Sequence, residues 1–215
     1  MKVALFWPCG ETGRAALQKF TQRGCFVYAY TDTPEEIKVD SSEYEVQHGR
    51  MDDPVMMERA VLLADVVVCC IGSRHLGNRK DESTPFYDGL QNVIAVMQKF
   101  GKKRIFLTCA ACEGESDNRM VRFFTGFLRR FAPHLYRDAS KVTQLVRESG
   151  LEYTVIRYMN PFLKKSKGGY LLSAAPGDKT RAGVSIENLA ECLADCVQKD
   201  AYVRQMPVVY NRRQD

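Results

Sequence analysis

The sequence lacks several features that would each assign it to a broad class of protein. No apolar run approaches the roughly 18 residues that a membrane-spanning helix requires. The first residues do not combine a basic segment, an apolar run and a small-residue cleavage site, so we expect no secretory signal. The net charge is only +5, and no basic run alternates with aromatic residues as in nucleic-acid-binding motifs. We therefore expect a cytoplasmic protein that has no nucleic-acid partner and no membrane-spanning segment, and a membrane is a disfavoured partner.

Metal-ligating patterns and disulfide frameworks are also missing. There are three histidines, which are scattered and show no metal spacing, so we expect no metal site. Eight cysteines are present, but their spacing does not resemble a disulfide framework, which is consistent with a reducing compartment. Cys109 and Cys112 form a C-x-x-C pair. We interpret them as buried structural thiols, with a redox-active pair and a zinc site as the alternatives.

Strands and helices alternate along the chain. Apolar residues make up 45% of the 215 positions and charged residues 27%, as in a globular protein with a full core. Apolar runs predict strands at 3–6, 25–30, 65–72 and 104–108, a further strand is expected at 44–47, and helices are expected between the strands. Further strands are expected at 153–158 and 170–173, and a helix at 186–197. This order predicts an α/β fold, a doubly wound parallel sheet, as a single domain over residues 1–215.

The first strand–turn–helix–strand unit, residues 2–32, has the pattern of a phosphate-binding site. Gly10 and Gly13 leave room at the start of a helix, where free N–H groups attract a pyrophosphate. Asp32 ends the next strand, where a carboxylate can accept both ribose hydroxyls of NAD. The turn residues predicted to bind the cofactor are Cys9, Gly10, Glu11, Thr12 and Gly13.

Trp7 occupies the place of the first glycine in such a turn. Because proline disfavours helical backbone in the residue before it, Pro8 predicts an extended Trp7 and a first strand that runs one residue further. The indole would then either pack under the turn or project into the dinucleotide groove. We expect weaker cofactor binding as a result.

The carboxyl ends of the other strands should meet at the same edge of the sheet. Gly72, Ser73 and Arg74 follow the fourth strand and are predicted to line the cofactor. Thr108 and Cys109 end the fifth strand, beside the expected nicotinamide position.

The order of these landmarks resembles the atypical short-chain dehydrogenases, and among them the biliverdin reductase B-like flavin reductases. The segments that carry the resemblance are 10–13, 65–74, 89–93, 147–157 and 184–190. The resemblance implies a Rossmann fold, a nicotinamide cofactor (NAD or NADP) and hydride transfer to a small planar acceptor, flavin-like or tetrapyrrole-like.

The same resemblance implies four catalytic residues: Thr108, which also contacts the cofactor, Cys109, Asn160 and Lys141. The chain departs from the family pattern at several positions, which include Trp7, Glu11, Arg50 and Ala110. It contains no Tyr-x-x-x-Lys pair, and Asp32 replaces the basic residue of many NADP-using members, which favours NAD. The alternative function is a degenerate dinucleotide-binding or redox-sensing regulatory protein without turnover. A third is a scaffold that binds no nucleotide.

Residues 119–137 form a basic segment with apolar residues at helical spacing. Five arginines lie in it, and no acidic residue occurs between Asp117 and Asp138. A core-packing helix with a solvated face is the favoured interpretation. A helix that attracts an anionic substrate to the active site, an acidic protein partner at Arg119–Arg137 and an anionic membrane are the alternatives.

Overall fold

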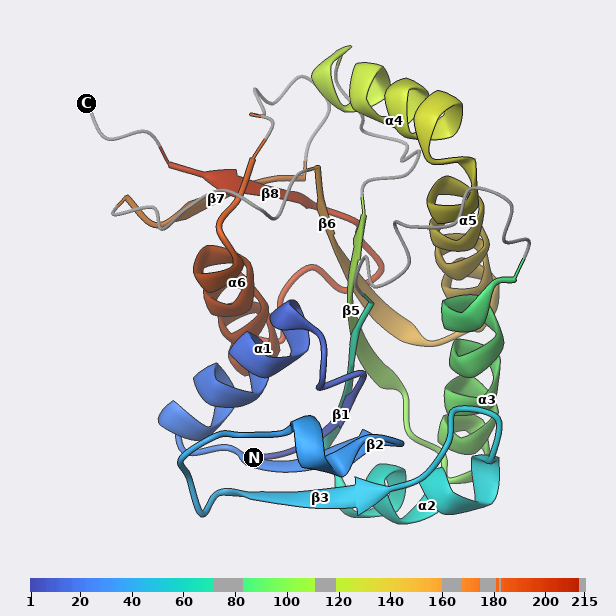
Figure 1. Cartoon of the computed structure of the whole chain (residues 1–215), viewed down its shortest axis with the longest axis vertical. Helices are drawn as coiled ribbons and strands as arrows, with labels where there is room; N and C mark the ends of the chain where they lie inside the picture. The colour runs from blue at the N-terminus through green and yellow to red at the C-terminus, as the bar shows by residue number, and fades with distance from the viewer. Residues whose placement is uncertain (72–82, 111–118, 160–167, 175–180, 182, 213–215) are drawn as a thin grey trace.

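A computed structural model describes residues 1–71, 83–110, 119–159, 168–174, 181 and 183–212. All its described strands belong to one eight-stranded sheet with the order β3-β2-β1-β4-β5-β6-β8-β7 (Figure 1). Seven strands are parallel, and β7 pairs with β8 in the antiparallel sense. The strands are β1 (Lys2–Phe6), β2 (Phe26–Thr31), β3 (Tyr44–His48), β4 (Val66–Cys70), β5 (Arg104–Ala110), β6 (Glu152–Tyr158), β7 (Tyr170–Ser173) and β8 (Val208–Asn211). The predicted doubly wound Rossmann-like fold is confirmed.

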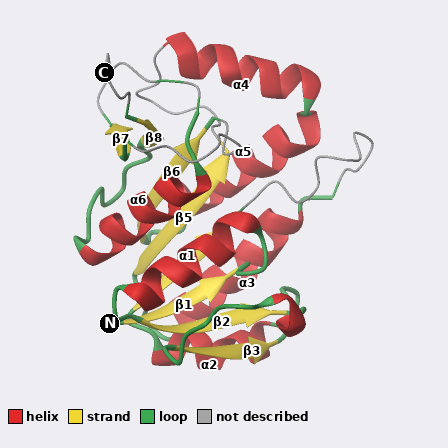
Figure 2. Ribbon diagram, turned by 60° about the vertical axis from the view of Figure 1, so that its left-hand side comes forward, coloured by secondary structure: helices red, strands yellow, loops and turns green. Residues whose placement is uncertain are grey.

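Helices cover both faces of the sheet (Figure 2). The helices α1 (Glu11–Gln22) and α6 (Ile186–Gln198) pack against each other on one face. The helices α2 (Pro54–Leu63), α3 (Pro85–Lys99) and α5 (Pro133–Glu148) bury their apolar sides on the other face. The helix α4 (Arg119–Phe131) lies beyond the ends of β5 and β6, and η1 (Pro34–Glu36) is a short 3-10 turn. In the described part of the chain, no helix is long and apolar enough to cross a membrane.

Local sequence signals account for several helix ends. The Asp53 carboxylate accepts hydrogen bonds from the N–H groups of Val55 and Met56 at the start of α2. The Ser185 hydroxyl accepts a hydrogen bond from the Asn188 N–H at 3.2 Å and so caps α6. Gly24 follows α1 with a φ of +73°, a left-handed conformation that glycine adopts without strain.

The structure differs from the sequence prediction in three places. The helix α3 begins at Pro85, whereas the apolar periodicity of Leu90, Val93, Ile94 and Met97 predicts a helix over 90–100. Pro34 and the two acidic residues after it are typical of a helix start, but residues 34–36 make only a 3-10 turn, and no sequence signal predicts β8. The short strand β8 has one parallel and one antiparallel neighbour, β6 and β7, so its existence depends on contacts that lie far away in the sequence.

Candidate cofactor-binding site

The N-terminus of α1 lies at the sheet edge where the parallel strands end (Figure 1). Gly10 is the residue before the helix, has extended backbone and supplies no side chain to cap it. A Cβ added to Gly10 would meet no atom of the described residues within 4 Å. The first N–H groups of α1 have no partner within the helix, and a helix start of this kind, preceded by a residue without a side chain, is the arrangement that binds phosphate oxygens. Of the next two residues, Glu11 is exposed and Thr12 is buried.

Gly13 serves a different purpose from Gly10. A Cβ on Gly13 would lie 2.2 Å from the carbonyl oxygen of Trp7 and 2.7 Å from Cα of Pro8. These are backbone atoms, which cannot move aside as the end of a flexible side chain can. The close approach of α1 to the turn therefore requires glycine at this position.

The backbone of Trp7 corrects the expectation based on Pro8. The strand β1 ends at Phe6, and Trp7 has a φ of +57° rather than an extended conformation. A left-handed conformation at a bulky residue stores about 1–2 kcal/mol of strain. The turn geometry therefore overrides the local preference, and glycine is the residue that would adopt this conformation without strain.

The indole of Trp7 packs against the α3 side of the sheet. Its ring contacts Phe86 edge-on with centroids 5.5 Å apart, and it is half-buried in the cluster that includes Met51. A Cβ on Gly89 would lie 2.8 Å from the indole. Cys9 and α1 belong to the cluster on the opposite face. Of the two orientations considered, the structure matches packing below the turn.

Replacing Trp7 by glycine tests this placement. Relief of the left-handed strain is expected to offset part of the lost indole packing, so stability should fall by less than about 2 kcal/mol. Dinucleotide affinity should change less than about threefold, or roughly 0.7 kcal/mol. Calorimetric titration of both proteins with NADH measures this. A gain in affinity of more than tenfold would show instead that the indole obstructs the groove.

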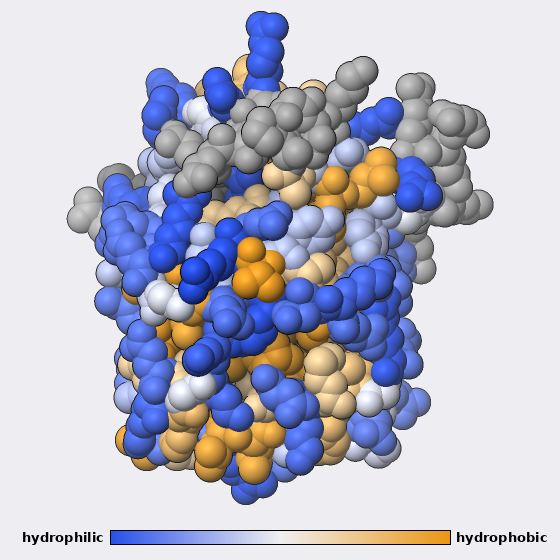
Figure 3. All heavy atoms as spheres, turned by 180° about the vertical axis from the view of Figure 1, so that it is seen from behind, coloured by the Kyte–Doolittle hydropathy of each residue, from blue (hydrophilic) through white to orange (hydrophobic). Residues whose placement is uncertain are grey.

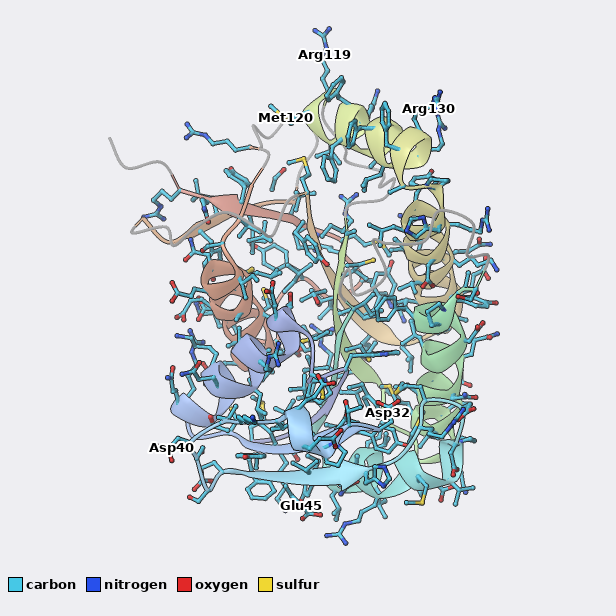
Figure 4. The ribbon with its side chains drawn as sticks, in the orientation of Figure 1. Asp32, Asp40, Glu45, Arg119, Met120 and Arg130 are labelled. Atoms are coloured by element: carbon cyan, nitrogen blue, oxygen red, sulfur yellow. The ribbon has the colours of Figure 1, made fainter. Side chains whose placement is uncertain are left out.

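Cys9 fastens the turn to the end of β2. Its buried sulfur lies 3.1 Å from Oγ1 of Thr31, and the Thr33 hydroxyl donates to the same sulfur at 3.4 Å. The N–H of Thr33 also donates to Oγ1 of Thr31 at 3.1 Å. These contacts hold residues 31–33 in a fixed turn and leave Asp32 exposed between the two threonines (Figure 4). Cys9 therefore holds the turn before α1 in a fixed position relative to Asp32.

The loop after β3 brings a cation near Asp32. Arg50 donates two hydrogen bonds to the Asp52 carboxylate, at 3.0 and 2.8 Å. This pairing raises the pKa of Arg50 above its usual value, and the charge of Asp32 adds to the effect. Both Arg50 and Asp52 are largely exposed, so Arg50 can change partners at little cost.

Tyr30 holds the same loop through a hydrogen bond to its backbone. Its hydroxyl donates to the carbonyl oxygen of Arg50 at 2.8 Å. Burial, together with the nearby charges of Asp53 and Asp52, raises the pKa of Tyr30 to about 12. A Cβ on Gly49 would lie 2.2 Å from the phenolic oxygen, so glycine at 49 allows the ring to reach the loop.

Thr108 and Cys109 lie at the carboxyl end of β5, as predicted, but both side chains are fully buried. Thr108 pairs with Cys70 of the neighbouring strand, and within the described part of the chain its buried hydroxyl has no partner at hydrogen-bonding geometry. Burial raises the pKa of Cys70 to about 12, although Thr108 lowers it in part. Cys109 packs into the core on the α3 and α5 side.

Lys141 lies apart from these two residues. It is exposed on α5, and its ammonium group lies 5.1 Å from the centre of the Tyr87 ring in the first turn of α3. The structure therefore does not bring Lys141 together with Thr108. Asn160, Gly72, Ser73, Arg74 and Cys112 lie outside the described residues.

Asp138 is a site-supporting residue that sequence reasoning missed. Its buried carboxylate accepts hydrogen bonds from the N–H groups of Phe86 and Tyr87, at 3.2 and 2.9 Å. Burial raises the pKa of Asp138, an effect that the two N–H donors partly oppose. This cap, supplied by α5, holds the first turn of α3 beside Trp7. Because donor and acceptor are 51 and 52 residues apart, no local pattern could reveal it.

Within the described ranges, no cluster of histidine, cysteine and acidic side chains could hold a metal ion. The seven cysteines of these ranges are buried and not joined in disulfides. Their burial is consistent with the structural interpretation of these thiols.

Comparisons with known proteins agree with this geometry. The profile of a family described as NAD(P)H-binding matches residues 9–200 of the chain. That range includes the turn, Asp32 and β4 to β6. No curated protein matches the sequence.

Several solved structures share the fold. A short-chain dehydrogenase/reductase from Veillonella parvula has a TM-score of 0.80 at 16% identity, covering 98% of this chain and 94% of that one. A second Veillonella parvula structure of this kind, in complex with NADP, has a TM-score of 0.76 at 16% identity over 97% and 93% of the two chains. A candidate NADH-flavin reductase from Streptococcus pneumoniae has a TM-score of 0.75 at 15% identity over 99% and 100%. At these identities the likeness shows the fold alone.

Proposed function

Because the chain belongs to the NAD(P)H-binding family, we propose that it is an NAD(P)H-dependent oxidoreductase that reduces a small planar acceptor, flavin-like or tetrapyrrole-like. The observation that carries the proposal is the open N-terminus of α1 at Gly10. A pyrophosphate requires such a space at the start of the helix. Asp32 is exposed directly after β2, the strand that follows α1 in the chain.

The start of α1, Cys9 and Asp32 each have a defined role in this proposal. The N–H groups that begin α1 bind the pyrophosphate, and Cys9 holds the turn in place through Thr31 and Thr33. The Asp32 carboxylate accepts the adenosine ribose hydroxyls. The bound dinucleotide supplies a hydride to the acceptor.

The end of β5 limits the kind of acceptor. Thr108 and Cys109 are fully buried, so neither presents an exposed acid or base beside the expected nicotinamide position. A ring that accepts a hydride by close stacking needs mainly alignment, and water can supply the proton. Flavin-like acceptors meet this condition, and the fold shared with the Streptococcus pneumoniae protein is consistent with them.

The proposal predicts flavin-dependent oxidation of NADH by the purified protein. Absorbance at the NADH maximum should fall in the presence of flavin mononucleotide at a turnover on the order of 1–10 per second. Gly10→Ala provides the matched control, because it alters only the phosphate site. Equal rates with and without protein, under conditions where NADH binding is saturated, would contradict the reductase assignment.

A second candidate is a dinucleotide-binding regulatory protein without turnover. It is favoured by the positions of three residues predicted to be catalytic: Thr108 and Cys109 are buried, and Lys141 lies over Tyr87. The assay above separates the candidates, since this one predicts saturable NADH binding with no oxidation.

A further inference from the structure

The helix α4 lies beyond the carboxyl ends of β5 and β6, outside the layers that cover the sheet (Figures 1 and 2). Its inner side packs through Val121, which contacts Met159 and Val208, and through Leu128. Thr125 is also buried. Only part of the circumference of α4 is used in this contact with the body of the protein.

The apolar surface of α4 extends well past the buried side. Met120, Phe123, Phe127 and Phe131 are exposed by 45%, 77%, 49% and 48%. Their spacing of three, four and four residues places them in one row along the helix, about 17 Å long. Every exposed phenylalanine of the described chain belongs to this row. We call these four residues the aromatic row.

Arginines border the aromatic row on its solvent side. The helical positions of Arg119 and Arg130 lie next to the row, and Arg122 and Arg129 continue the charged face. Figure 4 shows Arg119 and Arg130 extending outward from the helix. The helix contains no acidic residue, and no described carboxylate forms an ion pair with Arg119, Arg122 or Arg130.

The helix α2 also carries a group of exposed apolar residues, but that group is not bordered by a concentration of positive charge. Val55, Met56, Leu62 and Leu63 are exposed by 70%, 50%, 52% and 38%. Figure 3 shows apolar residues gathered at the lower end of the molecule, where α2 lies. The two charged residues of α2 are each paired: Glu58 with Lys99, and Arg59 with Glu45. The aromatic row therefore differs from the α2 group in its concentration of positive charge.

We propose that α4 docks on an anionic phospholipid surface, with the aromatic row inserted at the headgroup level and the arginines bound to lipid phosphates. A helix with an apolar face and a cationic border is suited to this position. Each arginine near an anionic surface strengthens binding about fivefold. This inference does not depend on the proposed reductase activity.

The geometry favours a bilayer over an acidic protein partner. A protein that binds a helix usually encloses it in a groove, with anchors on a continuous face. Here one side of α4 is already packed against the body through Val121 and Leu128, so a groove could not enclose the helix. A flat lipid surface needs only the exposed flank.

Co-sedimentation with vesicles tests the proposal on the whole protein. We expect binding to vesicles that contain phosphatidylserine in phosphatidylcholine, weaker binding at high salt and little binding to phosphatidylcholine alone. Arg119→Gln with Arg130→Gln should weaken partitioning about 30-fold. Phe123→Ser with Phe127→Ser should weaken it more than tenfold. Unchanged thermal unfolding of each double variant shows that the fold is intact.

Two matched controls complete the experiment. Val55→Ser with Leu62→Ser removes exposed apolar residues from α2, and Arg147→Gln with Arg204→Gln removes two exposed arginines elsewhere. Both controls should bind vesicles as the wild type does. Absence of wild-type binding, or equal losses in the α4 and control variants, would overturn the proposal. So would a change of oligomeric state in the Phe123 and Phe127 variant without any wild-type binding to lipid, since it would assign the row to a second copy.

Discussion

Gly10→Ala is expected to lower the affinity for NADH at least a hundredfold, or about 2.7 kcal/mol, with little change in stability. The added methyl group would meet no atom of the described residues within 4 Å, so we expect the folded protein to accept it. It would project into the space at the start of α1 that the pyrophosphate must occupy. Unfolding free energy should change by less than about 1 kcal/mol. Calorimetric titration and thermal unfolding of the same preparations measure both quantities.

Gly13→Ala is the contrasting variant. Its methyl group would overlap the carbonyl oxygen of Trp7, so α1 must shift away from the turn. Such overpacking typically destabilises by about 1–3 kcal/mol, which lowers the midpoint of unfolding by roughly 2–12 °C in a chain of this size. If Gly10→Ala binds NADH as the wild type does while Gly13→Ala unfolds early, the turn is structural and the phosphate assignment is wrong.

NADH is expected to bind at least tenfold more tightly than NADPH. The exposed carboxylate of Asp32 lies at the end of β2, where the added phosphate of NADPH would approach it. Since this site is open to solvent, the repulsion is expected at about 1.4 kcal/mol rather than at the larger values of buried pairs. Asp32→Asn removes the charge but keeps the shape, and it should reduce the preference to less than about threefold, or roughly 0.7 kcal/mol.

Arg50 provides the control for this preference. It is near enough to Asp32 to be affected by its charge, yet its own hydrogen bonds are to Asp52. Arg50→Gln should therefore leave NADH affinity unchanged. Tighter wild-type binding of NADPH than of NADH, abolished by Arg50→Gln, would show that Arg50 leaves Asp52 for the phosphate and that the prediction for Asp32 is wrong.

The sequence predicts the sheet and the phosphate turn because their signals are local. Continuous apolar runs mark β1, β4 and β5, and the glycines at 10 and 13 mark the helix start. The conformation of Trp7 could not be predicted in this way. The preference set by Pro8 favours extended backbone, whereas the packing of Gly13 against the Trp7 carbonyl imposes a turn.

Residues that support the site through contacts far apart in the sequence could not be predicted either. Asp138 caps α3 from another helix, and Lys141, one turn further along α5, lies over Tyr87 as a result of the same helix packing. For α4, periodicity identified the amphipathic helix but could not say how much of its apolar side is covered. The structure leaves four of those side chains exposed.

The central claim is that the N–H groups at the start of α1 bind the dinucleotide pyrophosphate. Amide ¹⁵N–¹H spectra recorded during titration with NADH test it most directly. The account predicts saturable shifts of the Glu11, Thr12 and Gly13 amides, in step with binding at concentrations between about 1 μM and 1 mM. Saturable shifts confined to other parts of the chain, or no saturable shift at all, would contradict it.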